Sequence, residues 1–104
     1  MIMWIVAVFD LPVRTPMERR NYRILRKKLL ASGFKPIQRS LLWRWVENKE
    51  FADALTQNLK KFCTIKGQIA FFYIPDVSFK NTELFDDGIR ILPPSPPPPW
   101  TILT

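Results

Sequence analysis

Two segments of seven residues are apolar at nearly every position, and they constrain the fold more than any other feature of the chain. Residues 3–9 and residues 68–74 are rich in β-branched and aromatic side chains, and each segment ends at a turn sequence or a proline. An apolar run without alternation is typical of a strand whose sheet is covered on both faces. A fold that contains both strands therefore needs a layer of structure on each side of its sheet.

A capping box predicts the first helix. Thr15 and Glu18 can satisfy each other's backbone donors, and Pro16 occupies the first helical position. We therefore predict a helix from Pro16 to about Ser32, which Gly33 ends. The side of this helix that is expected to pack carries Tyr22, Ile24, Leu25 and Leu29.

A pair of strands and a second helix are predicted for the middle of the chain. Residues 34–38 and 40–46 indicate two strands that are joined tightly at Arg39, because side chains alternate along the second segment. Asn48 can cap a helix that ends near Phe62. The packed side of this helix is expected to carry Phe51, Leu55, Leu59 and Phe62.

The predicted order of elements is β-α-β-β-α-β, which is a ferredoxin-like arrangement of the α+β class with an antiparallel sheet and both helices on one face. We assign residues 1–80 to this domain, residues 81–92 to a C-terminal extension with a short extra strand, and residues 93–104 to a proline-rich tail. The prolines of residues 93–99 favour polyproline II, as a stiff spacer or a docking ligand. A disordered end is the alternative.

The second face of this sheet has no predicted cover. Two helices cover one face only, yet the strands at residues 3–9 and 68–74 are apolar on both faces. A second copy of the chain, stacked on that face about a two-fold axis, would cover it without any further sequence. We therefore predict a homodimer.

Charge and composition exclude several classes of function. Lys and Arg number 16 against 9 Asp and Glu, so a net charge of +7 favours an anionic partner, nucleic acid ahead of a membrane surface. A charge that only maintains solubility is the alternative. Without histidine, catalysis by imidazole is excluded, and the single Cys63 fits a reducing cytoplasm. Residues 1–9 are too short to span a bilayer, so we expect no export or anchoring signal.

Basic residues gather on the first helix, its approach and the hairpin that follows. Such a field binds phosphates without reading sequence, and a solvated helix face is the alternative interpretation. Lys35 and Arg44 lie on the same hairpin. Trp43 and Trp45 are interpreted as core or dimer interface rather than as base-stacking residues. The candidate nucleic-acid-binding residues are Arg14, Arg19, Arg20, Arg23, Arg26, Lys27, Lys28 and Arg39.

Several short motifs occur in a characteristic order. They are Ile5-Val6-Ala7-Val8-Phe9-Asp10-Leu11-Pro12, Glu18-Arg19-Arg20, Tyr22-Arg23, Leu29-Leu30, Gly33-Phe34, Gln38-Arg39-Ser40-Leu41-Leu42 and Lys66-Gly67-Gln68-Ile69. In this order, over residues 4–80, the chain resembles the Cas2 family of CRISPR-associated proteins, in the form that accompanies single-effector CRISPR systems. The proline run and the residues after it depart from the family pattern.

The resemblance implies a ferredoxin-like homodimer that bridges two dimers of the integrase Cas1 and helps to capture and insert spacer DNA. It also implies metal-dependent nuclease activity on RNA or duplex DNA, which is described for several members. In the family the C-terminal segment adds a strand across the dimer and contacts the integrase. These roles fall on the strand with Ile89 and Ile91, and on the terminal segment with Trp100, Ile102 and Leu103.

Asp10 ends the first predicted strand and matches the metal-binding aspartate of the family. The resemblance implies that two copies of Asp10 face each other across the dimer and share a hydrated Mg²⁺ as a catalytic and metal site. Magnesium prefers oxygen ligands and keeps several waters, so one carboxylate per chain is a thin site. The alternative is that Asp10 accepts backbone hydrogen bonds in the turn that follows. The pair Asp86-Asp87 before Gly88 indicates an ordinary turn.

Three functions remain open at this stage. The first and favoured one is a scaffold for CRISPR spacer acquisition, which binds duplex DNA and recruits the integrase. The second is a Mg²⁺-dependent endonuclease or endoribonuclease that uses Asp10, so whether the chain is an enzyme stays open. The third is a general RNA-binding module of the same fold, which would prefer single strands and ignore the integrase.

Overall fold

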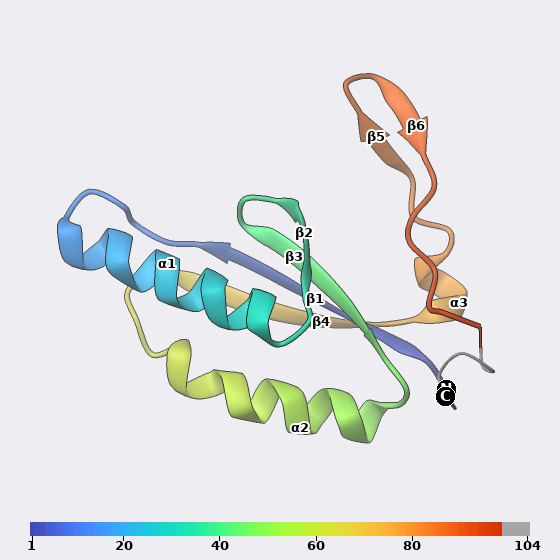
Figure 1. Ribbon diagram of the computed structural model, residues 1–104, viewed down its shortest axis with the longest axis horizontal. Coiled ribbons are helices and arrows are strands. Elements are labelled where there is room, and N and C mark those ends of the chain that lie inside the picture. Colours follow the sequence, from blue (N-terminus) through green and yellow to red (C-terminus); the bar gives the residue numbers. More distant parts are fainter. Residues whose placement is uncertain (99–104) are drawn as a thin grey trace.

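β1 (Met3–Asp10) lies at the centre of a four-stranded antiparallel sheet of order β2-β3-β1-β4 (Figure 1). The computed structural model describes residues 1–98. The remaining elements of the domain are α1 (Pro16–Ala31), β2 (Lys35–Gln38), β3 (Leu41–Val46), α2 (Lys49–Leu59), the 3-10 turn η1 (Lys60–Phe62) and β4 (Gln68–Pro75). The predicted ferredoxin-like order of elements is therefore confirmed. β2 and β4 form the two edges of the sheet, and β2 carries Pro36 and a break in register.

The capping box at the start of α1 forms as predicted. The Thr15 side chain accepts from the Glu18 backbone N–H at 3.1 Å, and the Glu18 carboxylate accepts from the Thr15 backbone N–H at 3.0 Å. Leu25 and Leu29 are fully buried. The expectation that Ile24 packs was wrong, because Ile24 lies about 100° around the helix from Leu25 and faces solvent.

Three of the four residues predicted to pack from the second helix do so: Leu59 is buried, and Leu55 and Phe62 pack half-buried against the core. Asn48 caps the helix by accepting from the Phe51 backbone N–H at 2.8 Å, as expected. Phe51 itself is exposed, and the buried positions are Ala52, Thr56 and Leu59. The buried Thr56 hydroxyl donates to the Ala52 carbonyl at 3.0 Å and accepts from the Tyr73 hydroxyl at 2.9 Å, so this polar side chain is satisfied within the core.

The two faces of the sheet are covered in different ways. Both long helices lie on one face (Figure 1), and Ile5, Ala7 and Phe9 of β1 are buried beneath them. Trp4, Val6 and Val8 alternate with these residues and point to the second face. The chain covers part of that face itself, whereas Phe72 of β4 is 54% exposed on it.

The cover of the second face comes from a segment in which no helix was predicted. Residues 76–88 contain the short helix α3 (Asp76–Phe79) and β5 (Leu84–Asp86). Phe79 of α3 stacks on Trp4, with ring centroids 4.0 Å apart, and meets Trp43 edge-on at 4.9 Å. The argument that a second copy must cover this whole face was therefore too broad, because α3 covers the end near Trp4.

A hairpin follows α3 and extends away from the sheet (Figure 1). The predicted strand at residues 89–92 forms as β6 (Ile89–Ile91), and it pairs with β5, which was not predicted. The predicted turn joins them, with Asp87 and Gly88 at positive φ. Residues 92–98 have no helix or strand, and the sequence-predicted contacts Trp100, Ile102 and Leu103 lie outside the described residues. Across residues 1–98, every helix is too short or too polar to cross a membrane.

Candidate nucleic-acid interface

Asp10 is the last residue of β1, and its side chain is exposed. By the alternation of the strand it lies on the same face as Trp4, Val6 and Val8, which is the face without the long helices. Within residues 1–98 its carboxylate forms no hydrogen bond and no ion pair. The alternative that Asp10 accepts from backbone donors of the following turn is therefore not what the structure shows.

Gly67 holds the start of β4 against the end of β1. Its φ is +113°, and a Cβ at this position would lie 2.7 Å from the Asp10 carbonyl oxygen. Only glycine fits this approach, which leaves a shallow cleft of about 470 Å³ beside Asp10. The cleft is lined by Asp10, Leu11, Pro12, Arg14, Glu18, Lys66 and Gly67.

Glu18 is the second carboxylate of this cleft, and it is already engaged. It accepts from the backbone N–H groups of Thr15 and Arg14, each at 3.0 Å, and lies 4.0 Å from the Lys66 ammonium. The Thr15 backbone N–H is the main cause that lowers the pKa of Glu18 below its ordinary value of 4.5, with smaller contributions from Arg14 and Lys66. Asp10 is therefore the carboxylate of the cleft that is free to meet a cation.

The side chains near Asp10 supply few metal ligands, so the chain alone could bind a metal ion only weakly. No group of three or more acidic or cysteine side chains that could hold a metal occurs in residues 1–98. A single carboxylate per chain could contribute to a hydrated Mg²⁺ site only together with further ligands, because magnesium retains most of its waters. Asp10 is the residue that would hold it.

Among residues 1–98, the candidate phosphate-binding side chains have no acidic partners. The ion pairs among the described residues are Lys49–Asp53, Lys66–Glu18 and Arg90–Glu83, and none uses a predicted cation. Arg20, Arg23 and Lys27 are exposed, and their spacing places them along one stripe of α1. This stripe spans about 10 Å, since the helix rises about 1.5 Å per residue.

Other predicted cations are positioned by contacts with the protein itself. Arg19 donates to the carbonyls of Val13 and Arg14, at 3.2 and 2.9 Å. Arg26 donates to the Arg39 carbonyl at 3.3 Å, and the Arg39 guanidinium lies 5.8 Å from the centre of the Tyr22 ring. These contacts use backbone carbonyls and an aromatic face, so within residues 1–98 no carboxylate pairs with these positive charges.

Arg44 does not belong to this field. Its guanidinium donates to the Ser32 carbonyl and lies 5.4 Å from the centre of the Phe51 ring. It is half-buried and joins β3 to the end of α1 and to α2. The expectation that it lies with the phosphate-binding residues was wrong, because it is on the face of β3 that the helices cover.

Sequence reasoning missed two lysines of this surface. Lys66 lines the Asp10 cleft, and the antiparallel pairing of β1 with β4 could have placed it there, since Asp10 is opposite Gln68. Lys61 lies 5.3 Å from the centre of the Phe62 ring, and Lys28 of α1 lies 5.1 Å from the same ring. Nothing in the sequence indicates that Lys28 and Lys61 lie near the same Phe62 ring, because this proximity depends on how α1 packs beside α2.

Trp43 and Trp45 have the structural roles that were favoured for them over base stacking. Trp43 is 5% exposed and belongs to the aromatic cluster with Trp4 and Phe79. Trp45 is half-buried and packs against that cluster.

Comparison with known proteins gives the family. A sequence model of the family described as CRISPR associated protein Cas2 matches residues 3–82, which is most of the chain. The chain belongs to the Cas2 family. It is therefore a CRISPR-associated protein, and the match covers the four-stranded sheet, both long helices and α3.

Individual Cas2 proteins support the same conclusion. The chain is 36% identical over 83 residues to the CRISPR-associated endoribonuclease Cas2 of Flavobacterium psychrophilum, which covers 80% of this chain and 72% of that protein. It is 40% identical over 79 residues to the protein of the same name from Lacticaseibacillus rhamnosus, with coverage of 76% and 78%. The crystal structure of Streptococcus pyogenes Cas2 matches with a TM-score of 0.57 at 21% identity, over 80% of this chain and 99% of that one, which shows the shared fold.

Proposed function

We propose that this Cas2 protein is a cytoplasmic scaffold for CRISPR spacer acquisition, in which a homodimer binds duplex DNA and bridges dimers of the integrase Cas1. The observation that carries the proposal is that the candidate cations of α1 and its approach have no carboxylate partner in residues 1–98. Uncompensated charge of this kind attracts phosphates and carries no sequence information. A protein that captures DNA of any sequence needs that property.

The open half of the second sheet face supports the homodimer. Phe72 is 54% exposed there, beside Val6 in the register of β1 with β4, and Ala70 and Val8 continue the apolar surface. A second copy stacked on this face would remove these side chains from water. The same arrangement would bring the Asp10 of each copy to the shared interface, because Asp10 follows Val8 on that face.

Binding of duplex DNA at several salt concentrations tests the scaffold. If a dimer meets about six phosphates, the logarithm of affinity falls against the logarithm of salt with a slope of about −5. Replacing Arg20, Arg23 and Lys27 together by Gln should bring this slope towards zero. The matched control replaces Lys49, Lys60 and Lys80 by Gln, which removes the same charge elsewhere. Equal slopes in wild type and in both variants would reject α1 as the DNA-binding surface.

Recruitment of the integrase is tested with the cognate Cas1 protein and short duplex DNA. The C-terminal strand with Ile89 and Ile91 is exposed, which suits a partner contact, and the tail beyond it is the second proposed contact. We expect a ternary complex with the full chain and a weaker one with a chain that stops after Leu92. Duplex binding that is unaffected by Cas1 in either form would exclude the bridging role.

A second candidate function is a Mg²⁺-dependent endonuclease, and a specific observation favours it. The uncommitted Asp10 carboxylate shares its cleft with the cations Arg14 and Lys66, so a metal ligand and phosphate-binding groups lie together. The relatives reported above carry the name endoribonuclease. A bound Mg²⁺ would lower the pKa of a coordinated water and supply the nucleophile without histidine. Asp10 would hold the ion, while Arg14 and Lys66 would orient the phosphate of the substrate.

Cleavage of RNA and of duplex DNA, with Mg²⁺ and with a chelator, tests this second function. Asp10→Asn should abolish the metal-dependent cleavage while duplex binding persists, because the α1 cations are untouched. Asp53→Asn is the control, since Asp53 is an exposed carboxylate whose contact is a surface pair with Lys49. Equal cleavage by wild type and Asp10→Asn would end the nuclease assignment and leave the scaffold standing.

A further inference from the structure

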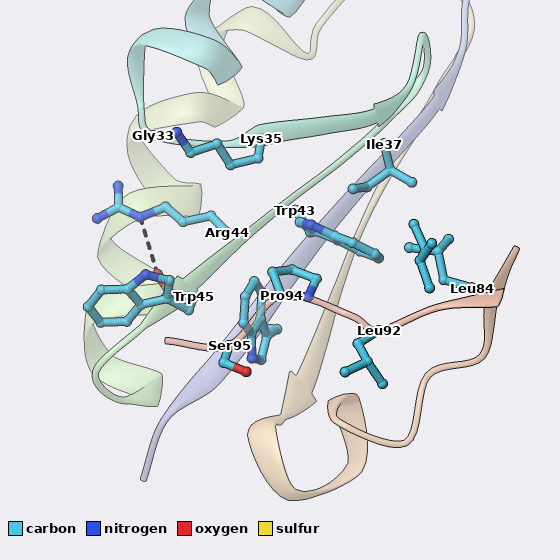
Figure 2. Close-up of a pocket in the computed structure, with 12 residues that line it drawn as sticks. Gly33, Lys35, Ile37, Trp43, Arg44, Trp45, Leu84, Leu92, Pro94 and Ser95 are labelled. Carbon is cyan, nitrogen blue, oxygen red and sulfur yellow. Dashed lines mark hydrogen bonds between the residues drawn. The ribbon is translucent and has the colours of Figure 1, made fainter. Parts of the chain in front are cut away.

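A cleft of about 440 Å³ lies on the second face of the sheet, at the end away from Asp10, and Ile91, a proposed integrase contact, forms part of its wall. Three tryptophans, Trp4, Trp43 and Trp45, line its floor together with Ile37 of β2 (Figure 2). The opposite wall is formed by the chain itself, through Leu84 of the hairpin and the residues that follow β6. The latter are Leu92, Pro94 and Ser95.

The proline segment is partly packed against the domain. Pro93, Pro96 and Pro97 are half-buried, whereas Pro94, Ser95 and Pro98 are exposed. In polyproline II, which has three residues per turn, Pro93 and Pro96 would share one side. A second, smaller hollow is lined by residues 92–96 together with Asp76 and Lys80 at the ends of α3. The segment therefore lies along the tryptophan cleft and along α3.

The floor of the cleft offers what a proline-rich ligand needs. Such segments dock in aromatic-lined grooves, and their carbonyl oxygens accept hydrogen bonds because proline has no N–H to donate. The Trp4 indole N–H is occupied by Asp76 at 2.8 Å. Within residues 1–98 the indole N–H groups of Trp43 and Trp45 have no hydrogen-bond partner, and neither is sealed from solvent, so both remain available as donors.

We propose that this tryptophan cleft is a binding site for polyproline II segments, and that residues 93–98 of the same chain are its resident ligand. The site is independent of the DNA-binding surface and of Asp10. Because the tail is tethered next to the cleft, its effective concentration there is on the order of millimolar. A proline-rich segment of another protein therefore has to displace the tail in order to bind.

A fluorescence experiment on the full-length chain tests the resident ligand. A Trp100→Phe background leaves Trp4, Trp43 and Trp45 as the emitting residues. In this background, replacement of Pro93, Pro94, Pro96 and Pro97 by Gly should increase acrylamide quenching of the emission, because the tail no longer covers the cleft. The domain is not altered by these changes, and circular dichroism verifies this. Unchanged quenching would show that the tail does not cover the cleft. Quenching that depends on protein concentration would show that the tail comes from another copy, and either result would overturn the proposal that the tail occupies the cleft of its own chain.

The binding site itself is tested with a peptide of the sequence LPPSPPP, added to both proteins. We expect at least about tenfold tighter binding to the glycine variant than to its background, because the resident tail is removed. A peptide with alanine in place of each proline is the control. Trp45→Leu in the glycine variant should abolish binding of the proline peptide, while Phe72→Leu on the same sheet face should not. Equal binding of the two peptides, or no binding to the glycine variant, would refute a polyproline site.

Discussion

The indole Nε1 of Trp4 donates a 2.8 Å hydrogen bond to Oδ1 of Asp76, and this bond joins the first strand to the residue at which α3 begins. Trp4 is 2% exposed, so its N–H would be costly to leave without a partner. The bond also fixes the start of α3, whose Phe79 then stacks on the same indole ring. One tryptophan thus provides both the hydrogen-bond donor and the stacking surface that hold α3 on the sheet.

Removal of the Asp76 carboxylate should therefore destabilise the protein. We expect Asp76→Ala to lower the free energy of unfolding by about 2 kcal/mol, since a partly buried bond to a charged group is lost. Asp76→Asn keeps an acceptor oxygen and should lose less. Urea denaturation followed by tryptophan fluorescence measures both values, and equal stability of Asp76→Ala and wild type would show that the bond is unimportant.

A side chain at Gly67 should disturb the end of β1. Gly67→Ala would place a Cβ 2.7 Å from the Asp10 carbonyl at a φ of +113°. We expect a loss of about 1–3 kcal/mol of stability, together with a loss of any Asp10-dependent cleavage. Gly88→Asn is the matched control, because a Cβ there has open space and asparagine tolerates its φ of +78°. Similar costs at the two positions would contradict the crowding at Asp10.

The capping box makes stability depend on pH. The pKa of Glu18 is lowered in the folded chain, first by the Thr15 backbone N–H, so the unfolded chain binds the proton more tightly. The stabilisation is therefore present above the ordinary value of 4.5 and is lost as pH falls through the folded pKa. Glu18→Gln should be less stable than wild type at neutral pH and equal to it in acid. Thermal unfolding across this range would contradict the assignment if the difference did not change with pH.

The exposed half of the second sheet face should control self-association. Phe72→Glu places a charge on the apolar surface proposed to meet a second copy, so we expect a monomer in light scattering where wild type is a dimer. Phe85→Glu is the control, because Phe85 is 61% exposed and belongs to the hairpin instead of the sheet. A dimer that survives Phe72→Glu, or a wild-type chain that is monomeric at micromolar concentration, would reject this interface.

Local signals in the sequence predicted most of the domain. The capping box at Thr15 and the cap at Asn48 formed as expected, because each depends on residues within one helical turn. The unbroken apolar character of residues 3–9 correctly predicted a strand, which the chain covers fully on the helix face and in part on the other face. The failures concern long-range packing: α3 has few local signals, and Phe79 is fixed by Trp4, which is distant in sequence.

For the candidate site, too, the sequence predicted local features and missed those that depend on long-range packing. The placement of Asp10 at the end of β1 followed from the sequence, whereas its shared cleft with Lys66 depends on strand pairing. Arg44 was assigned to the wrong surface because alternation along β3 gives two faces without saying which one the helices cover. The positions of Lys28 and Lys61 around Phe62 required the packing of α1 beside α2.

The edges of the sheet differ in their ability to accept another strand. β2 is short, its register breaks, and Pro36 lacks the N–H that a neighbouring strand would bond. β4 has eight residues without a proline before its last position. Within residues 1–98, the β4 edge of the four-stranded sheet therefore accepts a further strand more readily than the β2 edge, which would favour a closed pair of copies over an open fibre.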